Sequence, residues 1–304
     1  MVPIIASMNQ KGGSGKTTVV GLLAEFNALI MKRRVLLVDL DMQCNTTDQW
    51  VGMEEAPDLV GGQQPPQHPE YSENLGINQR SSIADIFYGK PVLPFTSWLN
   101  EKTINAGTVD VMCGHPQLLE EVNLKFTNKS GSIDEQILNR LRDFLLLDDL
   151  QASYDIILLD TGPSRNPIFR SAMRAATHII IPFKPEEKDI QGINAMLQIL
   201  RQENFSRSNI KLKLIGLLPN MVRNTKLHES TLNKISNGYS SALFPKKSWL
   251  NHLTAFPERD LKGIRPKSIF ELPKNNRAYL QALAMSEYVQ KYIFNSQPAG
   301  GQRK

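Results

Sequence analysis

The chain has 304 residues, of which 41% are hydrophobic, so it can bury one large core. Its two cysteines, Cys44 and Cys113, stand in no Cys-x-x-Cys or Cys/His spacing, which argues against a disulfide framework, a zinc site or an iron–sulfur cluster. The formal net charge of +5 conceals an asymmetry, because residues 1–200 carry 17 Lys and Arg against 24 Asp and Glu, whereas residues 201–304 carry 18 against 6.

Apolar runs rich in β-branched residues alternate with helix-length segments along the chain. Such continuous apolar runs are typical of a parallel sheet that is buried on both faces. The alternation predicts a doubly wound, mostly parallel α/β sheet with helices on both faces, in a single domain spanning residues 1–304. The expected strands lie within residues 2–8, 35–38, 156–159, 178–182 and 212–218, and the expected helices within residues 16–31, 133–150, 190–203, 225–237 and 275–294.

The first strand is followed by a glycine-rich loop and then by the first helix. Backbone N–H groups of such a loop can surround phosphate oxygens, and the N-terminus of the helix adds a favourable dipole. Lys16 would reach the β- and γ-phosphates, and Thr17 would ligate Mg²⁺. A glycine-rich turn without function is the alternative, but the order of strand, glycines, lysine and threonine favours a phosphate site formed by Lys11, Gly12, Gly13, Ser14, Gly15, Lys16, Thr17 and Thr18.

Two aspartates follow the second strand, in the sequence Asp39-Leu40-Asp41-Met42-Gln43. Carboxylates at the carboxyl end of a parallel strand lie beside the phosphate loop, where they can order waters on Mg²⁺ or orient an attacking water. A further aspartate, Asp160, ends the strand within residues 156–159 and can hold Mg²⁺ through water. Two ordinary loop aspartates at 39 and 41 are the alternative reading.

The segment 56–79 is rich in Gly, Pro, Gln and Asn, and it predicts a surface loop or insertion. No basic and apolar secretory leader is expected at the start of the chain, and no apolar run reaches the roughly 18 residues of a membrane span. We therefore expect a cytoplasmic protein.

The basic C-terminal third, residues 201–296, is expected to precede a flexible polar tail at 297–304. Lysines and arginines that meet phosphates support sequence-independent DNA binding, although such residues can also simply solvate exposed helices and turns. The candidates for DNA contact are Arg223, Lys226, Lys234, Lys246, Lys247, Lys262, Arg265, Lys267, Lys274 and Arg277.

The phosphate loop differs from the general Gly-x-x-x-x-Gly-Lys-[Ser/Thr] pattern by its additional lysine, Lys11. With that lysine, residues 11–18 match the signature Lys-Gly-Gly-x-Gly-Lys-Thr-[Ser/Thr] at every position, and the sequence resembles the ParA/MinD family of deviant Walker A P-loop ATPases, in particular its ParA-type partition or cargo-positioning members. The resemblance implies a homodimer with ATP sandwiched between the subunits, in which Lys11 crosses to the nucleotide of the other subunit. It also implies that Asp41 positions the hydrolytic water, that Asp39 supports the metal site, and that Asn220 lies near the adenine.

Two positions depart from the family pattern. Met42 replaces the proline that is usual between Asp41 and Gln43, and Gly162 replaces the first proline of the Asp-Thr-Pro-Pro sequence that usually follows the metal-binding strand. Both lie in segments that respond to the nucleotide in the family, so we expect their shape to differ here.

The resemblance further implies slow ATP hydrolysis that an adaptor protein stimulates, and non-specific binding of double-stranded DNA in the ATP state, which would associate the protein with the nucleoid. The alternative is a MinD-like, membrane-associated spatial regulator. Proteins of that kind end in an amphipathic helix, whereas residues 297–304 have no apolar face, so no membrane partner is expected.

Overall fold

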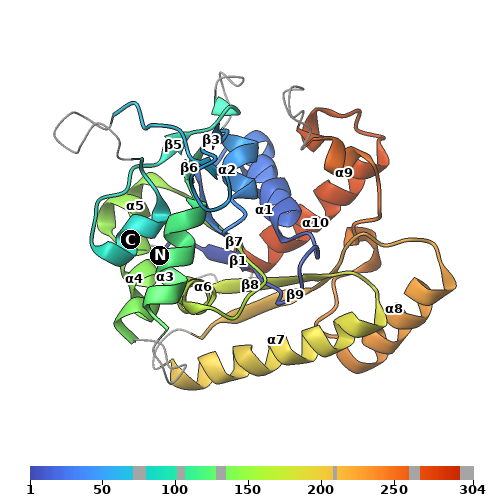
Figure 1. Cartoon of the computed structure of the whole chain (residues 1–304). Helices are drawn as coiled ribbons and strands as arrows, with labels where there is room; N and C mark the ends of the chain where they lie inside the picture. The colour runs from blue at the N-terminus through green and yellow to red at the C-terminus, as the bar shows by residue number, and fades with distance from the viewer. Residues whose placement is uncertain (71–79, 101–106, 128–134, 208–210, 260–267, 295–304) are drawn as a thin grey trace, which may run out of the picture.

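The computed structural model describes residues 1–70, 80–100, 107–127, 135–207, 211–259 and 268–294 (Figure 1). Its centre is a seven-stranded sheet in the order β5-β6-β2-β7-β1-β8-β9. All neighbouring strands run parallel except the pair β5 and β6, which confirms the predicted mostly parallel sheet. The strands are β1 (Ile4–Ser7), β2 (Val35–Leu40), β5 (Phe95–Thr96), β6 (Val109–Met112), β7 (Ile156–Thr161), β8 (His178–Phe183) and β9 (Lys213–Pro219).

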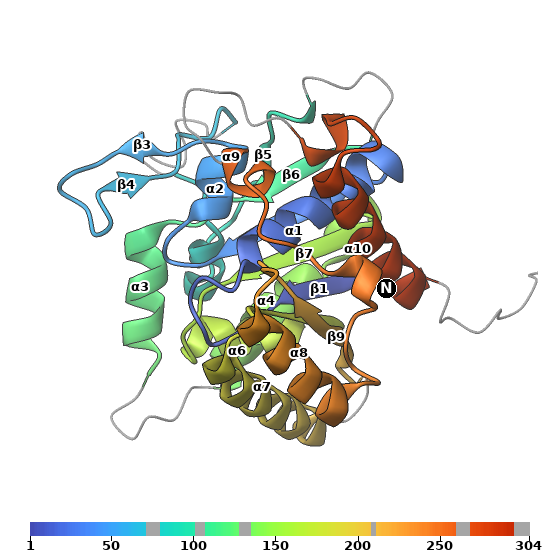
Figure 2. The same ribbon diagram turned by 90° about the vertical axis from the view of Figure 1, so that its right-hand side faces the viewer.

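Helices cover both faces of this sheet, and Figure 2 shows α1, α2 and α10 on one side of it and α6, α7 and α8 on the other. The first face packs against α1 (Lys16–Glu25), α2 (Asn45–Trp50), α9 (Ala255–Glu258), the 3₁₀ turn η6 (Ile269–Glu271) and α10 (Arg277–Phe294). The second packs against the 3₁₀ helix η3 (Ile83–Tyr88), α3 (Pro116–Lys125), α4 (Glu135–Leu145), α6 (Pro167–Ala175), α7 (Glu187–Ser206) and α8 (Lys226–Tyr239). The remaining helical elements are η1 (Phe26–Ile30), α5 (Asp148–Ser153) and η5 (Lys246–Ser248).

Side chains of the central strand β1 alternate between two apolar cores. Ile4 and Ala6 belong to the core under α4, α6 and α7, whereas Ile5 belongs to the core under α1 and α10. This alternation follows from the period of two in a strand, and it explains why the buried strands read as continuous apolar runs.

The first helix is apolar on nearly all sides because it lies between the sheet and α10. Its residues Val19, Leu22 and Ala24 are fully buried. The helix begins after Gly15, whose φ of 84° is a left-handed conformation that favours glycine. It continues into the π-helix η1, so the helix expected over residues 16–31 changes its pitch at Phe26.

Several elements differ from the sequence-based expectation. The segment expected as a loop takes part in a small hairpin, in which β3 (Glu54–Glu55) pairs with β4 (Gln63–Gln64), and His68 packs its buried ring on Phe95 with centroids 4.5 Å apart. Residues 71–79 of that segment and the expected tail at 297–304 lie outside the described residues. The helix expected over 133–150 is divided into α4 and α5 by an extended Leu147.

In the part of the chain that the structure describes, no helix combines the length and apolar character needed to cross a lipid bilayer. Both cysteines are buried free thiols.

Candidate active site

The phosphate loop and the three aspartates meet at the carboxyl edge of the sheet. The loop leaves β1, and β7 lies between β1 and β2. The register pairs Ser7 of β1 with Asp160 of β7, and Asp160 with Asp39 of β2. Parallel strands end at the same edge, so the loop and both carboxylates lie together there.

Asp39 and Asp160 form a buried pair of carboxylates, each with no solvent-exposed surface. Two consecutive threonines bind them: the hydroxyl and backbone N–H of Thr47 each donate to Asp39 Oδ2 at 2.7 Å, and the hydroxyl of Thr46 donates to Asp160 Oδ2 at 2.8 Å. Burial raises the pKa of both carboxyl groups, and the negative charge of neighbouring carboxylates adds to the effect. Such a pair provides a favourable place for a cation.

The donor atoms around this pair fit Mg²⁺. The hydroxyl of Thr17 donates to Asp160 Oδ2 at 2.7 Å, while Asp160 Oδ1 is buried and has no hydrogen-bond partner among the described residues. Mg²⁺ prefers carboxylate and hydroxyl oxygens together with waters and phosphate oxygens, rather than a full set of protein ligands. Thr17 and Asp160 could therefore hold the ion, with Asp39 supporting them.

Lys16 lies inside the phosphate loop and is only 6% exposed. Its ammonium donates to the backbone carbonyl of Lys11 at 3.4 Å. Burial lowers the pKa of this lysine, and the charges of Asp160 and Asp41 oppose that shift. A buried ammonium directed at the loop is suited to neutralise phosphate oxygens.

Asp41 stands at the edge of the same site. Its Oδ1 accepts a hydrogen bond from the backbone N–H of Gln43 at 3.1 Å. A Cβ atom built on Gly162 would lie 3.2 Å from the same oxygen, so the glycine found there in place of a proline leaves room for this carboxylate. Asp41 thus has a defined position between β2 and the turn after β7.

Asn220, directly after β9, binds the phosphate loop. Its side-chain amide donates to the carbonyl of Ser14 at 2.9 Å, and a Cβ atom on Gly15 would lie 1.9 Å from the Asn220 Nδ2 atom. Glycine is therefore required at position 15 both by its left-handed backbone and by this close approach.

Comparison with known proteins connects this geometry to a family. A family of AAA domains matches residues 2–214, well over half of the chain, so the chain belongs to that family. The chromosome-partitioning ATPase Soj of Thermus thermophilus is 28% identical over 223 residues, which cover 71% of this chain and 68% of Soj. Soj of Treponema pallidum is 25% identical over 242 residues, which cover 78% of this chain and 79% of that relative. The chain is a ParA-type P-loop ATPase.

Solved structures show the same fold for this ParA-type chain. The complex of a Cyanothece McdA variant with ATP superposes with a TM-score of 0.69 at 16% identity, covering 95% of this chain and 96% of McdA. The pNOB8 ParA structure superposes with a TM-score of 0.66 at 20% identity, covering 98% of this chain and all of that one.

The signature lysine of the ParA-type loop, Lys11, is bound within its own subunit. Its ammonium lies 2.5 Å from Asp189 Oδ2 and 3.2 Å from Glu186 Oε2. Burial lowers the pKa of this lysine, but its hydrogen bonds to Asp189 and then Glu186 outweigh burial and raise the pKa overall.

Several residues of this site were not predicted from the sequence. Thr46 and Thr47 lie just beyond the Asp-x-Asp-x-Gln motif. Their Asn-Thr-Thr sequence could have indicated a helix start beside the motif, because threonine is common at helix N-termini. Lys184 follows β8, and its Nζ atom would lie 3.7 Å from a Cβ atom on Gly13. Glu186 belongs to the same connection, between β8 and α7, and Asp189 lies in the first turn of α7.

The candidate DNA-binding residues are divided between separate elements. Arg223 is exposed in the turn before α8, and Lys226 is exposed at the first position of that helix. Lys246 and Lys247 are exposed on η5, which packs against α10. Of the other candidates, Lys234 pairs with Glu187 at 2.8 Å, while Lys262, Arg265 and Lys267 lie outside the described residues.

Proposed function

We propose that this ParA-type ATPase binds Mg-ATP and hydrolyses it slowly, dimerises around ATP, and in that state binds double-stranded DNA without sequence preference to partition DNA or position another large cargo. The observation that supports the proposal most is the meeting of a two-lysine phosphate loop with the buried pair Asp39 and Asp160. An adaptor protein would stimulate hydrolysis and select the cargo.

Each residue of the site has a defined part in the proposed reaction. Bound Mg²⁺ would neutralise charge on the phosphate oxygens. Lys16 would stabilise charge that develops on the β- and γ-phosphates, and Asp41 would orient the attacking water. Lys11 would add its charge to the nucleotide of the other subunit, where ADP offers fewer oxygens than ATP.

The charge distribution supports a polyanionic partner. Residues 201–304 carry 18 Lys and Arg against 6 Asp and Glu, and dimerisation would double the basic surface that one subunit presents. Phosphate contacts from two subunits release more counterions than contacts from one, so DNA binding should require ATP.

The dimerisation arm of the test uses light scattering with ATP, ADP and a slowly hydrolysed ATP analogue. The wild type should form a dimer with ATP and the analogue, and Lys16→Ala should bind no nucleotide. A monomer under every nucleotide would rule out the sandwiched dimer. Unchanged ATP affinity in Lys16→Ala would rule out the phosphate site.

The DNA arm measures binding to unrelated duplexes across a salt series. We expect ATP-dependent binding whose log affinity falls by about 0.9 per phosphate contact for each unit of log salt. Changing Lys246, Lys247, Lys262, Arg265 and Lys267 to Gln should abolish binding with ATP turnover intact. Changing Lys90, Lys125 and Arg140 to Gln removes exposed positive charges from residues 1–200, where acidic residues are in excess, and should leave DNA binding unchanged. Liposome binding in place of DNA binding would favour a membrane-associated regulator.

A further inference from the structure

Two acidic residues at the N-terminus of α7, Glu186 and Asp189, bind the signature lysine within its own subunit. Lys11 and Asp189 are 178 positions apart in the sequence, and they meet because β8 lies next to β1 and ends at the same edge of the sheet. The carboxylate of Asp189 has no exposed surface, and its Oδ1 atom has no hydrogen-bond partner among the described residues. The ammonium of Lys11 therefore supplies a hydrogen bond and an opposite charge to this buried carboxylate.

The second carboxylate on Lys11 is held differently. Glu186 is 35% exposed in its side chain, and it also pairs with Lys188 at 3.4 Å. If Lys11 moved away, Glu186 would still pair with Lys188 and contact water. The buried carboxylate of Asp189 would lose the cation that it binds. Leaving a buried charge without its partner is the larger cost, so Asp189 contributes most to retaining the lysine.

We propose that Asp189 is a positioning residue that keeps Lys11 in its own subunit and thereby sets the threshold for ATP-dependent dimerisation. The proposal rests on the proposed sandwich, because Lys11 cannot serve Asp189 and a partner's nucleotide at once. A dimer forms when the triphosphate of the second subunit competes successfully for the ammonium. Two such pairs must open in each dimer, so the restraint acts twice.

The test compares Asp189→Asn with Glu187→Gln. Both variants remove one carboxylate charge from the start of α7, but Glu187 is 73% exposed in its side chain and pairs with Lys234 rather than Lys11. Replacing the carboxylate by a neutral amide weakens the charge-assisted contact with Lys11 and should ease dimerisation about tenfold per subunit. The dimer dissociation constant of Asp189→Asn with the ATP analogue should therefore fall about 100-fold. Glu187→Gln should match the wild type.

A second measurement, made without nucleotide, separates this restraint from a general effect on folding. Thermal unfolding is measured for Lys11→Met, Asp189→Asn and the double variant. Lys11→Met should lower the melting temperature of the wild type, and it should have little further effect when Asp189 is already Asn. Additive effects of the two changes would overturn the proposed pair.

The outcomes also separate this proposal from the proposed function. Equal dimerisation of Asp189→Asn and wild type overturns the restraint and leaves the sandwich standing. A dimer that Asp189→Asn forms at a lower protein concentration than wild type supports the restraint. If neither dimerises while both bind ATP, the sandwich fails and the restraint on it fails too, whatever the unfolding cycle shows.

Discussion

Thr46 and Thr47, at the start of α2, divide their hydroxyl groups between the two buried carboxylates. Thr46 binds Asp160 and Thr47 binds Asp39, and the hydroxyl of Thr47 also accepts the backbone N–H of Gly114 at 2.8 Å. One short helix therefore fixes the orientation of both side chains. At the scale of residues, the site depends on groups that the phosphate-binding motif does not contain.

Asp41→Ala should separate hydrolysis from binding. The change removes the carboxylate that would orient water and leaves Lys16 and the loop in place, so turnover should fall at least about 100-fold while ATP affinity is retained. Phosphate release and nucleotide binding measure the two quantities. Asp58→Ala changes an exposed carboxylate and serves as the control. Turnover that survives in Asp41→Ala would assign the role to another group.

Gly15→Ala should destabilise the loop itself. The new Cβ atom would lie 1.9 Å from Asn220 Nδ2, on a backbone with a φ of 84°. We expect a loss of about 1–3 kcal/mol in the free energy of unfolding, together with weaker ATP binding. Gly12→Ala meets no atom within 4 Å and should leave the unfolding free energy nearly unchanged. The double variant Gly15→Ala, Asn220→Ala should recover part of the loss, and no recovery would contradict the steric explanation.

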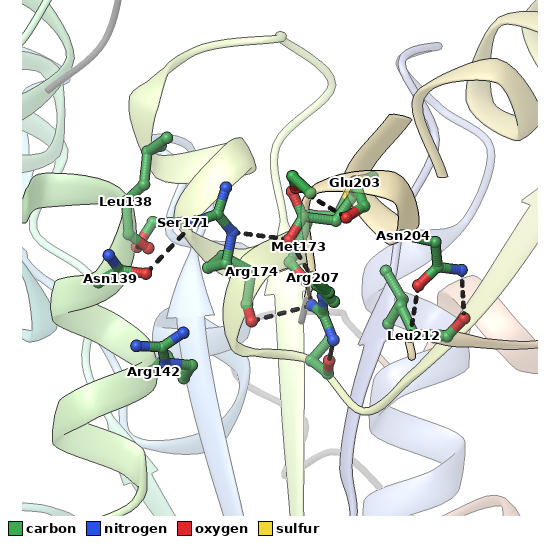
Figure 3. A network of polar contacts seen from close by, with 12 residues as sticks. Leu138, Asn139, Arg142, Ser171, Met173, Arg174, Glu203, Asn204, Arg207 and Leu212 are labelled. Carbon is green, nitrogen blue, oxygen red and sulfur yellow. Dashed lines mark hydrogen bonds and ion pairs between the residues drawn. The ribbon is translucent and has the colours of Figure 1, made fainter. Parts of the chain in front are cut away.

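At the scale of elements, one arginine joins two helices on the face away from α1. Figure 3 shows Arg207, directly after α7, reaching the end of α6. Its guanidinium donates to the carbonyls of Met173, Arg174 and Ala176 and to the carboxylate of Glu203. Nearby, Asn204 exchanges two hydrogen bonds with Leu212 and fixes the entry into β9. The arginine thus satisfies carbonyls that the end of α6 leaves free.

Arg207→Met should lower the free energy of unfolding by about 2–4 kcal/mol, because several carbonyls and part of the Glu203 charge lose a buried partner. Chemical denaturation measures this loss. Arg201→Met removes an exposed arginine from within α7 and should change stability little. Equal losses in the two variants would show that Arg207 contributes no more than a surface residue.

His178, the first residue of β8, should make the fold sensitive to acid. Burial lowers its pKa to about 4, and the charge of Lys213 adds to this effect. Between pH 6.5 and pH 4 the unfolded chain binds a proton there that the folded chain does not, so stability falls as pH falls, by roughly 2 kcal/mol from this residue. Denaturant unfolding at pH 7, 5.5 and 4 should show a flatter pH dependence for His178→Gln. Parallel curves would contradict the assignment.

The predictable elements are those whose burial follows a regular pattern along the sequence. The strands β1, β2, β7, β8 and β9 read as continuous apolar runs, and the helix α10 shows an apolar stripe. Asp110 interrupts β6, and β5 has only two residues, so neither gave a recognisable pattern. In the site, residues 11–18 and the strand-end aspartates follow from local motifs. The contact of Lys11 with Asp189 depends on which strands are neighbours, which local sequence does not reveal.

At the scale of the whole molecule, the C-terminal third supports the N-terminal half. Helix α10 packs on α1, and the segment after α8 runs beside β9, with hydrogen bonds from Leu217 to Ala242 and from Phe244 to Leu217. Arg259 after α9 pairs with the buried Glu25 of α1 at 3.0 Å. The basic third therefore also forms part of the core, and substitutions for DNA binding are best confined to exposed residues.

The first strand of the chain lies inside the sheet, between strands that are synthesised much later. β1 lies between β7 and β8, and the phosphate loop is braced by Asn220, 206 positions after Ser14. A ribosome releases the loop about 10–40 seconds before Asn220 at ordinary rates of synthesis. Stalled nascent chains of increasing length should therefore acquire labelled ATP only once residue 220 has left the exit tunnel. Before that point, we expect the nascent chain to contain residues 11–18 without binding a nucleotide.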